Sequence, residues 1–134
     1  MFVNRLINQG NLPVVEQKLR FHAARHQVLS ENIANLTTPG YQRKDLDEGK
    51  FQEALRSRVE SRRGQPTSTV RFDNLSKVDV TRPTDAMLFH DGNNRSVEQL
   101  MTDFQKNALT HNLFVELMKR QFSSIQSALK ERVS

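Results

Sequence analysis

The sequence predicts a mainly α protein in which two long terminal amphipathic helices pack as a coiled-coil-like pair, joined by an irregular middle segment. Two observations support this fold class. Near both ends of the chain, apolar residues recur with alternating steps of three and four, the spacing of helices that pack lengthwise. Between them the chain is polar and is broken by glycine and proline. With 134 residues, we expect a single unit, 1–134, and not two independent domains.

The first predicted helix covers residues 12–36. Pro13 falls in its first turn, where proline is tolerated. At the other end, Pro39 disfavours helix at Thr38, and the Pro-Gly pair predicts a type II turn. The helix must therefore stop by about Leu36. The apolar residues predicted to form its pairing seam are Val15, Leu19, Leu29 and Ile33.

The second predicted helix covers residues 96–132. A turn at residues 91–94 precedes it, and Ser96 with Gln99 has the spacing of a capping box. At about 1.5 Å per residue it is about 55 Å long, about 20 Å longer than the first helix. The residues predicted to form its pairing seam are Val97, Met101, Phe104, Val115, Met118, Phe122, Ile125 and Leu129.

Residues 41–95 form the connector, which we expect to be partly flexible. A short helix is predicted between Asp47 and Gly64. Its apolar residues recur every four positions and are Phe51, Leu55 and Val59. Farther along, apolar residues alternate on either side of Asp73 and Asn74, which is compatible with a β-hairpin. The residues of that pattern are Val70, Phe72, Val78 and Val80.

Both terminal helices carry apolar residues outside the predicted seam. A helix that is apolar nearly all round must be buried on all sides, which a pair of helices cannot achieve. The cover must come from the connector or from other protein chains, and the polarity of residues 41–95 favours other chains. The residues predicted to pack between subunits are Val14, Phe21, Val28, Leu109, Leu113, Phe114 and Leu117.

The stretch from Leu29 to Arg43, LSENIANLTTPGYQR, resembles the N-terminal signature of the bacterial flagellar rod, hook and filament-type axial proteins. Together with the long C-terminal heptad helix, it is most similar to the basal-body rod protein family, and within it to the proximal-rod member. The resemblance covers the two terminal helices, about half of the chain. The signature residues are Asn32, Asn35, Thr38, Pro39, Gly40 and Tyr41.

This resemblance implies a structural protein of the flagellar basal body and no enzyme. Such subunits stack through their terminal helices into a hollow tube that does not close on itself. The implied partners are other rod subunits, further copies of the chain, and membrane-ring and export-gate components at the rod base. The implied location is the rod in the periplasmic space, reached through the flagellar type III export apparatus. That route agrees with an N-terminus that does not resemble a Sec signal peptide.

No catalytic, cofactor-binding or metal site is predicted. The chain has no cysteine, which excludes disulfides and thiolate chemistry. His22 and His26 have a spacing that can hold a metal, but with His111 we interpret them as a polar layer in the helix seam. Asn32 and Asn35 are either recognition residues or helix caps, and capping is favoured.

The chain is basic, with a formal net charge of +5. A phosphate-binding role would use the arginine-rich stretch, but a solvated helix face explains it more simply. Its residues are Arg56, Arg58, Arg62 and Arg63. The alternative function is a basic coiled-coil binding module, an adaptor for nucleic acid or a membrane surface. Acidic residues interrupt both predicted helices, so nucleic acid is not an expected partner. No small-molecule substrate is expected, because the sequence shows no catalytic triad, glycine-rich phosphate loop or paired carboxylates.

Overall fold

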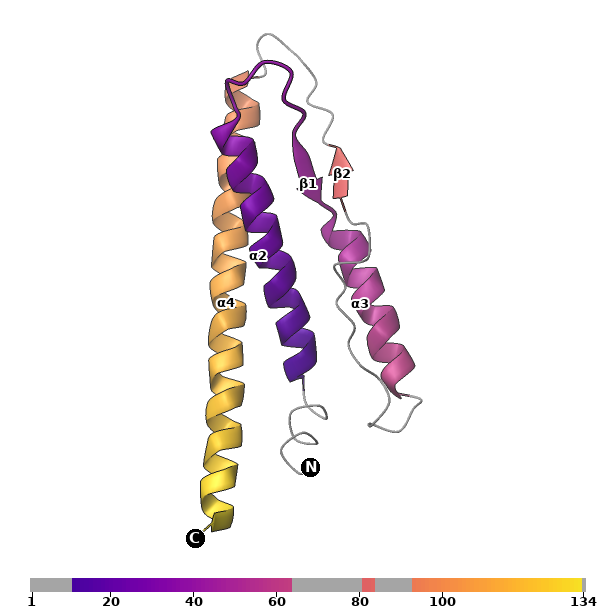
Figure 1. The fold of residues 1–134 in the computed structure, drawn as a ribbon, viewed down its shortest axis with the longest axis vertical. Helices are drawn as coiled ribbons and strands as arrows, with labels where there is room; N and C mark the ends of the chain where they lie inside the picture. Colours follow the sequence, from indigo (N-terminus) through magenta and orange to yellow (C-terminus); the bar gives the residue numbers. More distant parts are fainter. Residues whose placement is uncertain (1–10, 64–80, 84–92, 134) are drawn as a thin grey trace.

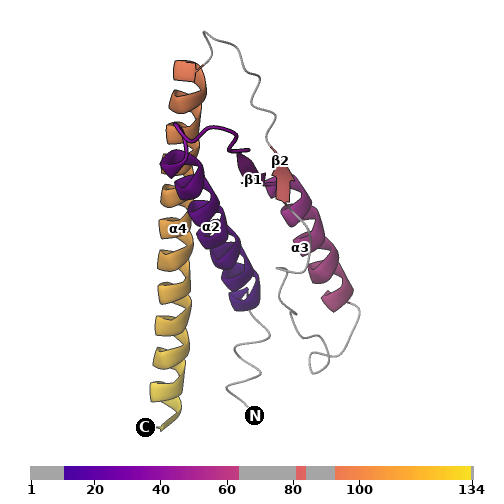
Figure 2. The same ribbon diagram turned by 45° about the horizontal axis from the view of Figure 1, so that its top comes forward.

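A computed structural model describes residues 11–63, 81–83 and 93–133 of the chain. In order, these residues form α2 (Leu12–Ala34), β1 (Lys44–Leu46), α3 (Glu48–Arg63), β2 (Thr81–Pro83) and α4 (Asn93–Val133). Figure 1 shows α2 and α4 side by side, with α3 on the side of α2 that faces away from α4. The same order is seen in the turned view of Figure 2. The predicted mainly α fold with paired terminal helices is confirmed.

Helix α2 begins where the sequence predicted and ends two residues earlier than predicted. Asn35 is its C-cap, and the Asn35 backbone N–H donates to the carbonyl of Glu31 over 3.0 Å. The chain then turns sharply. Gly40 has φ +75°, and the Tyr41 N–H donates to the Thr38 carbonyl over 3.4 Å. The predicted type II turn is therefore confirmed, since it requires a positive φ at its third position.

Helix α4 begins at Asn93, three residues before the predicted start, so the predicted capping box at Ser96 is wrong. Ser96 lies inside the helix, and its hydroxyl accepts a hydrogen bond from Arg43 in the connector. With 41 residues against 23, α4 is about 62 Å long and α2 about 35 Å. The two helices run antiparallel, and the C-terminal part of α4 extends past the start of α2 (Figure 1).

The connector contains the predicted short helix. Asp47 precedes α3 and accepts the Lys50 N–H on its carboxylate over 3.1 Å, which caps the first turn. Beside it, β1 and β2 form an antiparallel ladder that the sequence analysis did not predict, with Lys44 opposite Pro83. The hairpin considered around Asp73 and Asn74 lies outside the described residues.

The core of the described chain lies between α2, β1 and α3. Its buried residues are Phe21, Leu46, Phe51 and Leu55, and the partly buried Val14, Val28 and Ala54 pack against them. The rings of Phe21 and Phe51 stack, with centroids 4.1 Å apart and planes inclined by 12°. Phe21, predicted to pack between subunits, is therefore buried within this chain, and Val14 and Val28 are partly covered by the same core. The connector is polar on average, but it gathers its apolar side chains on one face of α3, and that face covers α2.

Candidate functional site

The seam between α2 and α4 contains a buried polar pair. Nδ1 of His22 lies 2.8 Å from Oδ1 of Asn107, and the Asn107 amide nitrogen donates to the His22 carbonyl, also over 2.8 Å. Because Oδ1 is an acceptor, the His22 ring donates from Nδ1. His22 is 5% exposed and Asn107 is 2% exposed. The predicted polar layer is thus built around an asparagine that the sequence analysis missed.

Aromatic rings flank this pair. Phe114 stacks on His22 with ring centroids 5.5 Å apart, and Lys18 Nζ lies 5.3 Å from the Phe114 ring centroid. Nearer the start of α4, Phe104 stacks on His26 at 4.3 Å. Phe114 therefore contacts α2 in the seam, a position that the sequence analysis did not assign to it. His111 is partly buried on the same helix.

The remaining seam residues follow the prediction unevenly. Val15 and Leu29 are buried, as is Leu100, which the sequence analysis omitted. The partly buried ones opposite α2 are Leu19, Ile33, Val97, Phe104, Val115 and Met118. Ile125 and Leu129 are also partly buried, but they lie past the start of α2. Met101 is 40% exposed and Phe122 is 50% exposed, so neither is buried in the seam as predicted.

Two different causes explain these exposed residues. The row of α4 that faces α2 contains Leu100, Asn107 and Phe114, and Met101 lies about 100° further round the helix. Phe122 lies beyond the reach of α2. Since His22 pairs with Asn107, the start of α2 ten residues earlier falls near Leu117 of the antiparallel helix.

Helix α4 also carries an exposed apolar row outside the seam. Leu109 is 71% exposed, Leu113 is 56% exposed and Leu117 is 36% exposed. Residues four apart lie on one helix face; at about 100° per residue, Leu109 lies about 160°, Leu113 about 100° and Leu117 about 60° round from the nearest residue of the row that faces α2. We call these three residues the leucine stripe. The sequence analysis assigned all three to packing between subunits, and within this chain they remain open to solvent.

The signature residues form a clamp at the end of α2. Asn32 is 2% exposed, and its side chain pairs with the backbone of Lys44 in β1. Its amide nitrogen donates to the Lys44 carbonyl over 2.6 Å, and its oxygen accepts the Lys44 N–H over 3.2 Å. The Tyr41 hydroxyl donates to the same oxygen over 3.2 Å. Asn32 thus ties the chain after the turn back to the helix before it.

Asn35 has the capping role that the sequence favoured. Its amide nitrogen donates to the Glu31 carbonyl over 2.8 Å, and its oxygen accepts from the Thr38 hydroxyl over 3.2 Å.

A second polar contact, which the sequence analysis did not predict, joins α2 to the connector. The Arg25 guanidinium donates to both carboxylate oxygens of Asp45, over 3.1 and 3.3 Å, and to Glu48 over 3.3 Å. This forked geometry fixes direction as well as distance.

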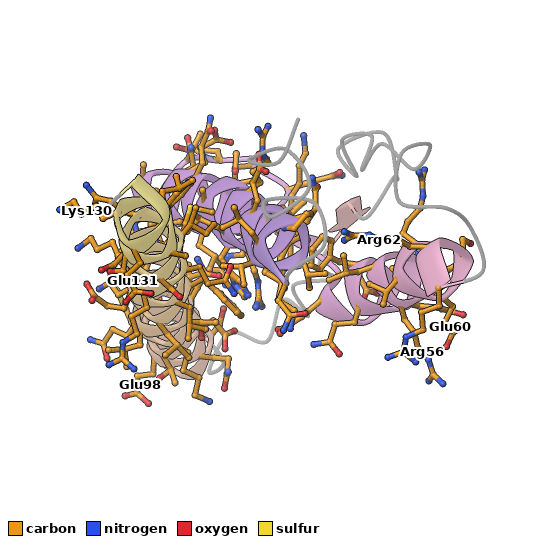
Figure 3. The ribbon with its side chains drawn as sticks, turned by 90° about the horizontal axis from the view of Figure 1, so that it is seen from below. Arg56, Glu60, Arg62, Glu98, Lys130 and Glu131 are labelled. Atoms are coloured by element: carbon orange, nitrogen blue, oxygen red, sulfur yellow. The ribbon has the colours of Figure 1, made fainter. Side chains whose placement is uncertain are left out.

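The arginine-rich stretch lies on α3. Figure 3 shows Arg56 and Glu60 projecting outward from this helix. They form an ion pair at 2.9 Å, with the two side chains 81% and 59% exposed. Such exposed pairs contribute little to stability.

Within the described ranges, no three His, Cys, Asp or Glu residues are grouped so that they could hold a metal ion. None of the described helices is long and apolar enough to span a membrane.

Comparison with known proteins adds an observation that geometry alone cannot provide. The flagellar basal body rod protein FlgB of Bacillus subtilis is 26% identical over 120 residues, which cover 90% of this chain and 93% of that protein. FlgB of Yersinia enterocolitica is 28% identical, over 91% of this chain and 95% of its own length. The chain is similar to FlgB over nearly its whole length.

Further FlgB proteins match in the same way. FlgB of Escherichia coli K12 is 28% identical over 127 residues, covering 86% of this chain and 89% of that protein. The similarity therefore includes the connector, which the signature motif does not cover. The resemblance to basal-body rod proteins predicted from the signature is confirmed. No family model and no solved structure matches the chain.

Proposed function

We propose that this chain is a structural subunit of the bacterial flagellar basal-body rod. The observation that carries the proposal is the similarity to FlgB rod proteins across about nine-tenths of the chain. The antiparallel helix pair agrees with it, because rod subunits of the resembled family stack through terminal helices. The chain performs no catalysis in this role. It assembles with further copies of itself and with other rod subunits into the proximal part of a hollow shaft.

The proposal extends to the place of assembly. The chain contacts membrane-ring and export-gate components at the rod base, in the periplasmic space, after export through the flagellar type III apparatus. A subunit at the start of a tube needs surfaces for the neighbours beside it and above it. An open assembly uses two different surfaces on each subunit, so that each copy leaves one free for the next.

The leucine stripe is the surface that we assign to contact between subunits. Three neighbouring leucines that remain 36 to 71% exposed form an apolar row of the kind that marks interaction sites. Burying one fully exposed leucine is worth about 1.5–3 kcal/mol, so covering Leu109 and Leu113, which are 71% and 56% exposed, stabilises each contact by about 2–4 kcal/mol. Leu109 and Leu113 lie about 160° and 100° round from the row that faces α2, so replacing these two leaves the pairing of α2 with α4 intact.

The experiment replaces both Leu109 and Leu113 by serine and measures how much chain enters purified basal bodies. We expect the variant to be made and exported but to enter the rod poorly. A matched control replaces the exposed polar residues Gln105 and Asn112, also on α4, by serine and should assemble normally. A Phe114→Ser variant should instead lower the stability of the free chain, because that ring packs on His22. Normal assembly of the Leu109/Leu113 variant contradicts the assigned contact.

A further inference from the structure

Apolar burial alone does not determine which side of α4 faces α2. Between Leu100 and Met118 the helix carries apolar residues on every side. One row contains Leu100, Asn107 and Phe114, and the neighbouring row contains Met101, Ala108 and Val115. The second row has no polar member. If apolar area decided the pairing, the second row would be buried and the asparagine would face water.

The structure buries the row that contains the asparagine more deeply, although Ala108 and Val115 of the other row are partly buried. Asn107 is 2% exposed while Met101 is 40% exposed. The Asn107 amide compensates for its burial through two hydrogen bonds of 2.8 Å, one with the His22 ring and one with the His22 carbonyl. A rotation of α4 by one residue, about 100°, would break both. It would leave the buried Nδ1–H of His22 facing apolar side chains with no acceptor, which is costly.

The other histidine of the seam lacks this directional property. His26 stacks on Phe104, but Nδ1 of His26 is buried without a hydrogen-bond partner. A ring can stack on many flat or aliphatic side chains, so this contact could form at several rotations of the helix. The hydrogen bonds between His22 and Asn107 can form at only one rotation. Buried asparagines fix the register of coiled coils for the same reason.

We propose that the His22–Asn107 pair sets the rotation of α4 about its own axis and so determines which apolar face remains outside. In the observed rotation Leu100 is buried and Phe114 packs on His22, while Met101 remains 40% exposed. His22 and Asn107 therefore determine which side chains of α4 remain available to a partner chain. Only the contact of that outer face with a partner rests on the proposed function, because the rotation itself is a property of the single chain.

The test uses the absence of cysteine from the natural chain. Single cysteines are placed at position 100 (Leu100→Cys) or position 101 (Met101→Cys), and the rate of maleimide labelling is measured in the purified full chain. A buried thiol reacts only through local opening, so we expect Met101→Cys to label more than about tenfold faster than Leu100→Cys. When His22→Leu and Asn107→Leu are added together, that ratio should fall to within about twofold of one.

The control adds His26→Leu instead, which removes a seam histidine without breaking the pair, and the ratio should stay high. Circular dichroism checks the helix content of every variant. If the double leucine variant loses its helices, Asn107→Ala replaces it, and the ratio should again fall. The proposal is overturned if the ratio is near one in the natural background, if it survives loss of the pair, or if His26→Leu lowers it equally. These results do not depend on whether the chain enters a flagellum.

Discussion

Replacing Asn32 by alanine tests the clamp at the end of α2. The side chain makes three hydrogen bonds, two to the Lys44 backbone and one from the Tyr41 hydroxyl, at 2.6, 3.2 and 3.2 Å. At about 0.5–1.5 kcal/mol for each bond, the change should lower the free energy of unfolding by about 3 kcal/mol. The loss is large because Asn32 is 2% exposed, so water cannot easily replace these partners.

The matched control is Asn35→Ala, a few residues along the same signature. The Asn35 amide nitrogen donates over 2.8 Å to a carbonyl at an exposed helix end, where water can take its place. We expect a loss below about 1 kcal/mol for this variant. Urea unfolding followed by circular dichroism gives both values from the shift in midpoint at constant slope. Equal losses for the two variants, or a loss below about 1 kcal/mol for Asn32→Ala, would refute the clamp.

Two further predictions concern the turn and the core. Gly40→Val should lower the free energy of unfolding by about 1–2 kcal/mol, because φ is +75° there, although the space around a new Cβ is open. Urea unfolding should show a smaller loss for Gly40→Asn, and equal losses would argue against backbone strain. Phe51→Ala should lower the free energy of unfolding by about 3–5 kcal/mol and make α3 more susceptible to proteolysis, because this ring is 4% exposed and stacks on Phe21. Val59→Ala, on the partly buried edge of the same helix, should cost less, and an equal cost would argue against a core centred on Phe51.

The sequence predicted the long elements well because their evidence is local. Helix α2, the turn at Gly40 and helix α3 follow from apolar spacing and from the demands of proline and glycine. The start of α4 was misplaced because Ser96 has capping chemistry yet lies within the helix. The three-residue strands β1 and β2 were missed, since they are too short to show a period and pair across a long stretch of chain.

The errors in the candidate site have a common origin. Heptad spacing cannot distinguish two adjacent residues when both are apolar, so Met101 was chosen where Leu100 is buried. A sequence signal was present, because a buried His22 needs a polar partner and Asn107 lies one heptad from both Leu100 and Phe114. The cover of Phe21 was assigned to other chains because the average polarity of the connector concealed the apolar face of α3.

The central claim is that the chain is a structural part of the flagellar rod. The most direct measurement compares purified basal bodies from the natural strain, from a strain lacking the gene, and from that strain carrying a restored copy. We predict that mass spectrometry detects the chain in the rod of the natural strain. Micrographs of the deletion strain should show basal bodies without a rod, and the restored copy of the gene should bring the rod back. Complete rods in the deletion strain, or absence of the chain from natural basal bodies, would contradict the claim.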